Sequence, residues 1–268
     1  MKKVSALQII NVLALIATLV MNGLSQTDLF PNTVGDLGES RAIFFLPAGY
    51  VFAIWGVIYT GLIAYSIYQA RPSERNGDVV NSIGWWFVAS CIANIAWLAL
   101  FLYDLVWLST IAMIAIIIPL IIIYTRLGIG VKSVSLAEKW AVHIPFSIYL
   151  GWVSVATVAN FSTALYTSGY VTSFAGINAD IWASIMLVVA GVLALTMLYF
   201  RRDVAYALVI VWASYGINAR PFDTDLYSIL SNLDAGLVDT MALSIAIIVA
   251  IASVITLGFA LMQSQKTA

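Results

Sequence analysis

Aromatic rings and amides recur at helical spacing in three apolar stretches of the sequence, and these side chains are the ones best suited to hold a molecule. In residues 86–101 the rings and the amide, together with Ser90, follow spacings of four, four, three and four, which places them along one face of a helix. Similar stripes lie in residues 145–163 and 52–62. Each stripe alone is also typical of a helix-packing seam, and an amide in hydrocarbon must face another helix or a cavity.

Three such stripes on neighbouring helices predict a wall for a flat, hydrophobic molecule such as a conjugated ring system or a sterol-like lipid. Ring faces would stack on it and the few amides would orient it. The predicted ligand-binding residues on the stripes are Phe52, Trp55, Tyr59, Asn94, Trp97, Phe101, Tyr149, Trp152, Ala156 and Asn160.

Ionisable side chains, which carry most catalytic chemistry, are scarce inside these apolar stretches. The sole histidine, His143, is expected about one turn inside a helix and bonded to a neighbouring carbonyl, and bis-histidine haem ligation needs two. The single cysteine, Cys91, excludes a disulfide within the chain and a multi-cysteine metal site. We therefore expect no catalytic residue, no metal site and no required cofactor.

The composition indicates that these stripes lie within a membrane. Of 268 residues, 62% are hydrophobic and 9% are charged, with a mean hydropathy of +0.99. Such a chain cannot cover a water-facing surface, so a soluble globular protein is excluded. The net charge of −1 offers no basic patch for nucleic acid. Long apolar runs predict transmembrane helices rather than the alternating segments of a β-barrel.

Windows of transmembrane length predict eight helices and an orientation for them. The helices are expected at residues 6–24, 47–69, 81–103, 105–125, 140–165, 181–200, 204–219 and 240–262. Ten of the twelve Lys and Arg residues then fall on the side of the two termini, and only Arg41 and Arg220 on the other. The positive-inside rule predicts an integral, multi-pass protein of a bacterial-type plasma membrane with both termini cytoplasmic.

The longer connections of the outer side are residues 25–46 and 220–239. The first mixes turn formers with apolar residues such as Leu29, Phe30 and Phe44, so it either folds back onto the bundle mouth or forms a solvated loop with a short interfacial helix. Arg220 could pair locally with Asp223 and Asp225. Alternatively, Arg41 and Arg220 could together receive a carboxylate of the ligand.

At these residues the sequence resembles the TspO/MBR family, the tryptophan-rich sensory proteins related to the mitochondrial translocator protein. The resemblance covers residues 1 to about 166 through LPAGYVFAIWGVIY, NIAWLALF and PFSIYLGWVSVATVAN. Besides the stripe residues above, these motifs include Pro47, Tyr50, Pro145 and Phe146. One departure is that Phe52 stands one residue closer to Trp55 than the family pattern places it.

The resemblance implies an all-α membrane protein with a five-helix bundle at residues 1–166, to which residues 167–268 add a three-helix region. It also implies a pocket inside the bundle, capped by the first loop, that binds protoporphyrin, haem or sterol-like lipids. Membrane lipids and a hydrophobic small molecule are the expected partners. A homodimer is implied as well, and we expect the added helices to affect its contacts.

The leading hypothesis is therefore a membrane ligand-binding protein, either a sensor or receptor or a translocator. The alternative is a small secondary transporter with eight spans, although no internal repeat relates residues 1–130 to residues 131–268. An intramembrane enzyme acting on bound porphyrin is the third hypothesis.

Overall fold

A computed structural model describes residues 5–74, 77–222 and 224–266. Lys2, Lys3, Arg75 and Asp223, which entered the charge argument above, lie outside the described residues.

The described chain is almost entirely helical, and its apolar helices match the eight predicted spans in number and order. Six segments have the length and apolar character of a membrane span, and two more apolar helices are shorter. The helices that form these segments are α1 (Ala6–Leu24), η1 (Gly49–Ala53) with α3 (Ile54–Gln69), α5 (Trp86–Leu102), α6 (Val106–Leu127), α8 (Ile144–Thr167), α9 (Ala179–Arg201), α10 (Val204–Asn218) and α11 (Ala235–Lys266). The prediction of an all-α polytopic membrane protein is confirmed.

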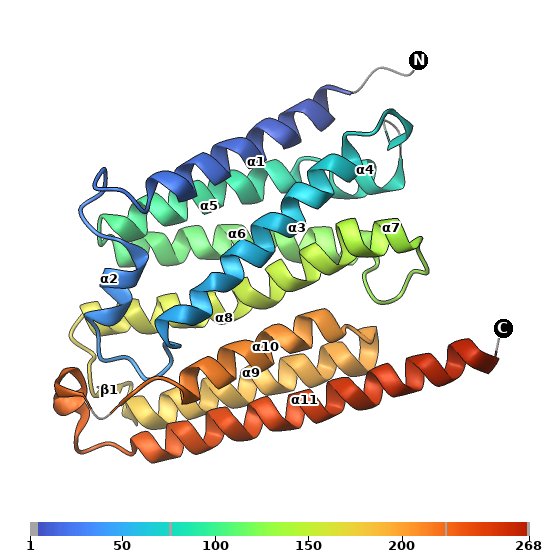
Figure 1. The fold of residues 1–268 in the computed structure, drawn as a ribbon. Helices are drawn as coiled ribbons and strands as arrows, with labels where there is room; N and C mark the ends of the chain where they lie inside the picture. The colour runs from blue at the N-terminus through green and yellow to red at the C-terminus, as the bar shows by residue number, and fades with distance from the viewer. Residues whose placement is uncertain (1–4, 75–76, 223, 267–268) are drawn as a thin grey trace.

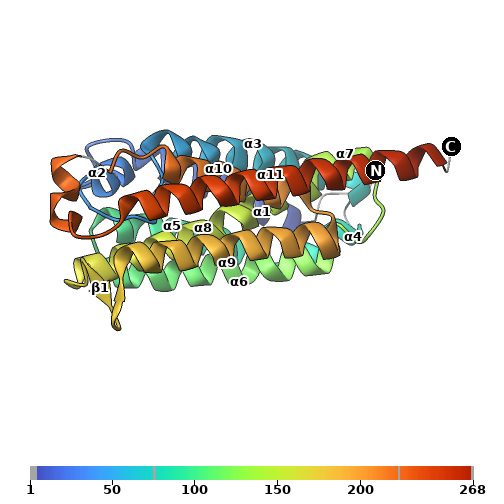
Figure 2. The same cartoon turned by 90° about the horizontal axis from the view of Figure 1, so that it is seen from below.

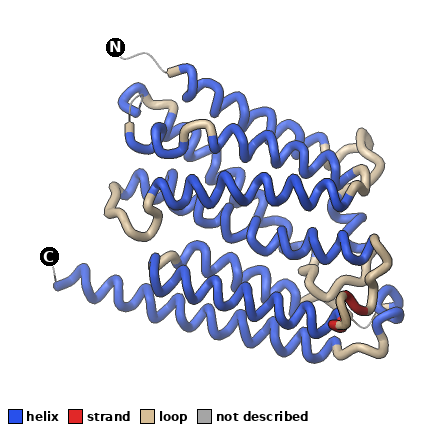
Figure 3. Tube along the Cα trace, turned by 180° about the vertical axis from the view of Figure 1, so that it is seen from behind, coloured by secondary structure: helices blue, strands red, loops and turns tan. Residues whose placement is uncertain are grey.

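Short elements connect these helices near the two ends of the molecule. They are α2 (Val34–Glu39), η2 (Pro72–Glu74), α4 (Asp78–Ile83), α7 (Leu136–Glu138), the π-helical turn η3 (Lys139–His143), η4 (Asp225–Leu230), and the antiparallel strands β1 (Ser173–Phe174) and β2 (Ile177–Asn178). Figure 3 shows both termini at one end of the molecule and the strand pair among the loops of the other end. An even number of passages between the two ends explains this placement.

The helices form two groups that lie side by side (Figure 1). Helices α1, α3, α5, α6 and α8 make a five-helix bundle, and α9, α10 and α11 make a second group that contacts the first chiefly through α10 against α8. Figure 2, which is seen from below, shows α9 and α11 nearest the viewer, on the side of α10 that faces away from α8. Close approach depends on Gly151 of α8, where a Cβ would lie 3.1 Å from Val209 Cβ and 3.3 Å from the Tyr206 carbonyl.

One of the eight helices is clearly shorter than the sequence predicted, and α10 is short both in the prediction and in the structure. The predicted span 81–103 breaks at Gly84, whose φ of +52° is accessible to glycine and rarely to other residues, so α4 ends there and α5 begins at Trp86. Helix α10 has 15 residues, which at 1.5 Å per residue gives roughly 22 Å, less than the roughly 30 Å hydrocarbon core. The polar ends of α10 therefore lie close to the apolar region.

A buried carboxylate joins the two groups at the first end of α10. Asp203 is 6% exposed and caps α10 by accepting from the Tyr206 amide at 3.1 Å. It also accepts from the Tyr124 hydroxyl of α6 at 2.8 Å and from the Ser147 hydroxyl of α8. Three donors on three helices thus satisfy one buried charge, as a charge in this position requires.

Candidate ligand-binding cavity

A cavity of about 410 Å³ lies beneath the first outer loop, inside the end of the bundle that is opposite the termini. Its volume falls within the range of small-molecule pockets. The residues that line it come from α1, the first loop, η1, α3, α5 and the segment after α10, and include Asn22, Ser25, Gln26, Val34, Gly38, Glu39, Pro47, Gly49, Phe52, Trp55, Tyr59, Trp97, Leu98 and Arg220.

The cavity, called here the main cavity, exists because α1 and α3 contact each other at one end and diverge toward the other (Figure 1). At the end near the termini the Gln8 and Gln69 side chains each donate to the other's backbone carbonyl, at 2.5 and 3.0 Å, and Asn11 donates to the Tyr65 hydroxyl at 3.3 Å. Amides buried in hydrocarbon need such partners. These bonds hold the narrow end of a wedge whose wide end is the main cavity.

The first outer loop folds back onto the bundle mouth, which was one of the two predicted alternatives. Residues 42–46 are all buried, and Leu37 anchors α2 from the same side at 6% exposure. Leu29 differs from the expectation because it is 65% exposed. We call residues 34–51 the lid, since they run from α2 across the mouth to the start of α3 and several of them line the main cavity.

The inner wall of the main cavity is a continuous stack of aromatic rings. Trp55 stacks on Tyr59 at a centroid distance of 5.4 Å and on Trp97 at 5.7 Å, with interplanar angles of 22° and 27°. Trp97 stacks in turn on Phe101 at 6.0 Å and 28°. All four residues were predicted as site residues, and their near-parallel rings join α3 to α5. Offset stacking of this kind is a favoured geometry for aromatic rings.

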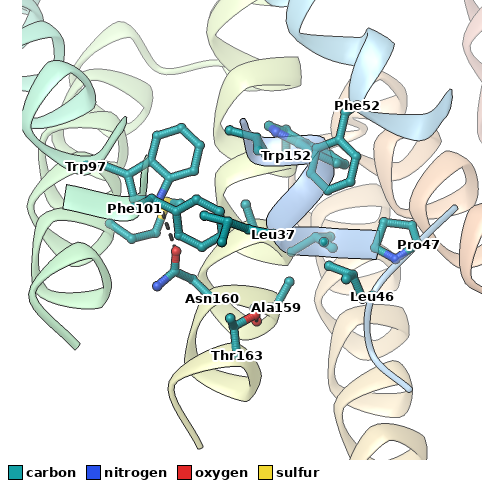
Figure 4. Close-up of a pocket in the computed structure, with 15 residues that line it drawn as sticks. Leu37, Leu46, Pro47, Phe52, Trp97, Phe101, Trp152, Ala159, Asn160 and Thr163 are labelled. Carbon is teal, nitrogen blue, oxygen red and sulfur yellow. Dashed lines mark hydrogen bonds between the residues drawn. The ribbon is translucent and has the colours of Figure 1, made fainter. Parts of the chain in front are cut away.

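A second cavity, of only about 40 Å³, lies beside the main cavity and shares Phe52, Trp97 and Pro47 with it. Figure 4 shows Leu37, Leu46 and Pro47 of the lid facing Trp97 and Phe101 across this small cavity. Since one water needs roughly 10–15 Å³ of cavity volume, the small cavity has room for only a few waters.

The predicted site residues are thus divided between the two cavities. Phe52, Trp55, Tyr59 and Trp97 line the main cavity. Phe52 and Trp97 also line the small cavity, together with Phe101, Trp152, Ala156 and Asn160. Asn94 and Tyr149 line neither of these two cavities.

The two predicted asparagines act within the protein, because their hydrogen bonds join helices. Asn160 accepts from Trp97 Nε1 at 3.0 Å and donates to Thr110 Oγ1 at 2.7 Å, which connects α8 to α5 and α6. Asn94 accepts from Asn22 Nδ2 at 3.2 Å and donates to the Tyr149 hydroxyl at 3.4 Å. The bond to Asn160 fixes the Trp97 ring, and the bonds of Asn94 hold α5 against α1 and α8.

Two polar atoms on the cavity walls have no hydrogen-bond partner among the described residues. They are the Tyr59 hydroxyl, on the wall of the main cavity, and Trp152 Nε1, on the wall of the small one. A buried donor without an acceptor costs free energy that a bound acceptor would recover.

The two outer arginines differ in their surroundings. Arg41 is 5% exposed and forms an ion pair with Asp104 in the turn between α5 and α6, and it lines neither cavity. Arg220 lines the main cavity and donates to the carbonyls of Gly38 and Arg41, at 3.0 and 3.3 Å, and of Pro47 at 3.4 Å. No carboxylate among the described residues forms an ion pair with Arg220.

Polar cavity residues that the sequence did not single out lie at the end of α1 and on α2. Asn22 lies in the last turn of α1, Ser25 and Gln26 directly follow the helix, and Glu39 ends α2. Asn22 and Gln26 lie one turn apart, which could have indicated a polar stripe on the first span.

His143 lies far from this site, near the opposite end of the molecule. It is 5% exposed, and its Nε2 has no hydrogen-bond partner among the described residues and stands 3.7 Å from Glu138 Oε1. The carbonyl partner expected from the sequence is not seen for this nitrogen. Among the described residues, no three His, Cys, Asp or Glu side chains are grouped so that they could hold a metal ion.

Two helix groups of membrane-spanning character, with a cavity lined by aromatic rings beneath the lid, define a polytopic α-helical membrane protein. Comparison with protein families agrees: residues 8–256 match the model of the TSPO-like protein family, so the chain belongs to that family. The match includes α9, α10 and most of α11 as well as the five-helix bundle. Searches of curated proteins and of solved structures found no match.

Thr33 caps α2 at the start of the lid. The Thr33 hydroxyl donates to the Asp36 carboxylate at 2.7 Å and the Thr33 amide donates at 3.1 Å, and these bonds lower the pKa of Asp36 below its ordinary value of 3.8. A depressed carboxylate pKa means that the cap stabilises α2 above pH 3.8 and loses this effect as the pH falls through the lower, folded-state value.

Carbon-detected NMR titration of Asp36 should therefore give a midpoint below 3.8 in the wild type. Thr33→Val removes the hydroxyl donor but keeps the amide, so it should move the midpoint back toward 3.8. A wild-type midpoint at or above 3.8 would show that the cap does not form.

Proposed function

We propose that this protein is a membrane ligand-binding protein of receptor or translocator type that holds a flat hydrophobic molecule, such as a tetrapyrrole or a sterol-like lipid, in the main cavity. The observation that carries this proposal is the aromatic wall formed by Tyr59, Trp55 and Trp97 beside a cavity of about 410 Å³. Of the site residues predicted from the sequence, Phe52, Trp55, Tyr59, Trp97 and Arg220 line the main cavity and carry this proposal. The proposed partners are a hydrophobic small molecule and membrane lipids.

The shape and polarity of the main cavity favour a flat molecule with a polar end. The near-parallel rings of Trp55 and Trp97 offer an extended apolar face, on which a second planar system can stack. The polar groups gather toward the lid, where Asn22, Gln26 and Arg220 line the same cavity. A tetrapyrrole ring on the wall would direct a propionate toward Arg220, whose guanidinium suits a carboxylate.

The membrane orientation follows from the charges. Described cations such as Arg71, Arg126, Lys132 and Arg201 lie at the end of the termini, whereas Arg41 and Arg220 lie at the lid end. By the positive-inside rule we place the termini in the cytoplasm of a bacterial-type cell and the lid on the outer face of the plasma membrane.

The proposal is tested by titrating the purified protein in nanodiscs with protoporphyrin and, separately, with a fluorescent sterol. Saturable binding of at least one of them, with quenching of tryptophan fluorescence, is the expected result, because the rings of Trp55, Tyr59 and Trp97 line the main cavity together. If neither probe binds saturably, the proposed ligand class is wrong.

Tyr59→Phe is expected to have opposite effects on binding and on stability. The substitution removes a buried hydroxyl that has no partner in the described chain, so the apparent melting temperature should stay the same or rise slightly. Affinity for a ligand that accepts a hydrogen bond from this hydroxyl should fall by roughly threefold to tenfold, as expected for one hydrogen bond. Both quantities are measured on the same nanodisc samples.

Tyr103→Phe is the matched control, since Tyr103 is 57% exposed and lines neither cavity. It should change neither quantity. If Tyr59→Phe binds as tightly as the wild type, the Tyr59 hydroxyl does not contact the ligand.

A further inference from the structure

The lid belongs to the five-helix bundle in sequence, but it is held in place largely by the second helix group. The Ala48 amide donates to the Gly216 carbonyl at 2.9 Å, and Trp212 Nε1 donates to the Val51 carbonyl at 3.0 Å. The Gly216 carbonyl and the Trp212 indole both lie in the last turns of α10. The chain segment that enters α3 and lines the main cavity is therefore bonded directly to α10.

Side-chain packing reinforces these bonds at the same place. A Cβ on Gly216 would lie 2.2 Å from Val51 Cγ2 and 3.2 Å from Pro47 Cβ, so only glycine admits the lid this close to α10. The Tyr50 ring meets Trp212 edge-on at a centroid distance of 5.6 Å. Any larger residue at position 216 must push residues 47–51 toward the cavity or away from α10.

The contact continues along the rest of the lid through the segment that follows α10. Arg220 bonds to the carbonyls of Gly38, Arg41 and Pro47, which span both ends of the lid. From η4, the Tyr227 hydroxyl donates to the Ile43 carbonyl at 3.1 Å, and Phe44 packs against Phe222 at 5.3 Å. Backbone carbonyls that face away from water need donors, and here the second helix group supplies them.

From these contacts we infer that the end of α10 anchors the lid, and that Trp212, Gly216 and Arg220 are positioning residues for ligand binding. The three last helices then complete the binding site, because they set how readily the lid leaves the mouth of the main cavity. This inference rests on the proposed function only where it concerns the ligand. The anchoring itself is a property of the free protein.

Hydrogen–deuterium exchange on the ligand-free, full-length protein in nanodiscs tests the anchoring. Trp212→Phe removes the indole donor to Val51 while it keeps an aromatic ring, so peptides that cover residues 34–51 should exchange several-fold faster than in the wild type. Trp107→Phe is the matched control: Trp107 is similarly exposed, at 47% against 37%, and its Nε1 donates to Ser168 Oγ at 2.8 Å, away from the lid. It should leave lid exchange unchanged.

A second pair of variants tests the consequence for binding. Gly216→Ala should displace residues 47–51 and raise the dissociation rate of bound protoporphyrin about tenfold. Gly191→Ala is its control, because a Cβ there would meet Ile245 of α11 at 2.8 Å and would disturb the second helix group without touching the lid. Its dissociation rate should stay within about twofold of the wild-type rate.

The outcomes separate the two proposals. If the wild type binds protoporphyrin but neither Trp212→Phe nor Gly216→Ala changes lid exchange or the dissociation rate, the anchor is wrong. If lid exchange rises in Trp212→Phe while the wild type binds neither probe, the anchor stands and the proposed ligand class fails. Equal acceleration in Trp107→Phe would also contradict the anchor, because the effect would then not be local.

Discussion

Trp55→Ala is expected to weaken protoporphyrin binding by roughly 10- to 100-fold, the largest effect of any single change at the site. Trp55 lies at the centre of the wall, where it stacks on Tyr59 and Trp97 and meets Trp152 edge-on at 6.4 Å. Its removal takes away the ligand's main stacking face and also frees its neighbours to rotate. Because Trp55 is half-buried and borders open space, the fold should survive the change better than after loss of the buried Trp97.

The control for this prediction is Trp140→Ala. Trp140 is 68% exposed and lies in η3, at the other end of the molecule. It should leave affinity unchanged, while removal of either tryptophan lowers the total protein fluorescence. Affinity is measured by titration of the Soret band. Unchanged affinity in Trp55→Ala would show that the aromatic wall does not bind the ligand.

Asp203→Leu should cause the largest loss of stability. The substitution leaves the Tyr124 hydroxyl, the Ser147 hydroxyl and the Tyr206 amide without their common acceptor in a buried place. At about 1 kcal/mol or more for each stranded donor, the loss is at least about 3 kcal/mol. For a chain of this size that corresponds to a fall in melting temperature of roughly 6–12 °C.

Asp203→Asn serves as the graded comparison, since its amide oxygen still accepts a hydrogen bond and its volume is nearly the same. Its melting temperature, measured by thermal unfolding in the same detergent, should fall between those of the wild type and Asp203→Leu. If Asp203→Leu has the same melting temperature as the wild type, the junction of α6, α8 and α10 does not depend on this carboxylate.

The helices and the aromatic stripe were accessible from sequence because both follow from periodicity. Apolar runs of span length must become helices in a bilayer, where every backbone group needs a partner within its own segment. Trp97 and Phe101, four residues apart on one helix, must lie on one face, and their stack at 6.0 Å confirms this. The boundary at Gly84 was missed, since a single glycine inside an apolar run does not reveal its φ of +52°.

The position of the main cavity was not accessible in the same way. It depends on the pairing of Gln8 with Gln69, which are 61 residues apart and carry no local signal of their contact. The sequence likewise treated Arg41 and Arg220 as equivalent outer cations. Only the fold shows that Asp104 pairs with Arg41, while Arg220 reaches the lid and the main cavity.

The central claim is that the ligand lies on the Trp55 and Trp97 faces beneath the lid, and an experimental structure of the protein with bound protoporphyrin tests it most directly. We expect planar density for the bound protoporphyrin against Trp55, between α1 and α3, with the polar edge of the ligand toward Arg220. Density on the lipid-facing surface, or between α8 and α10, with an empty main cavity, would contradict it.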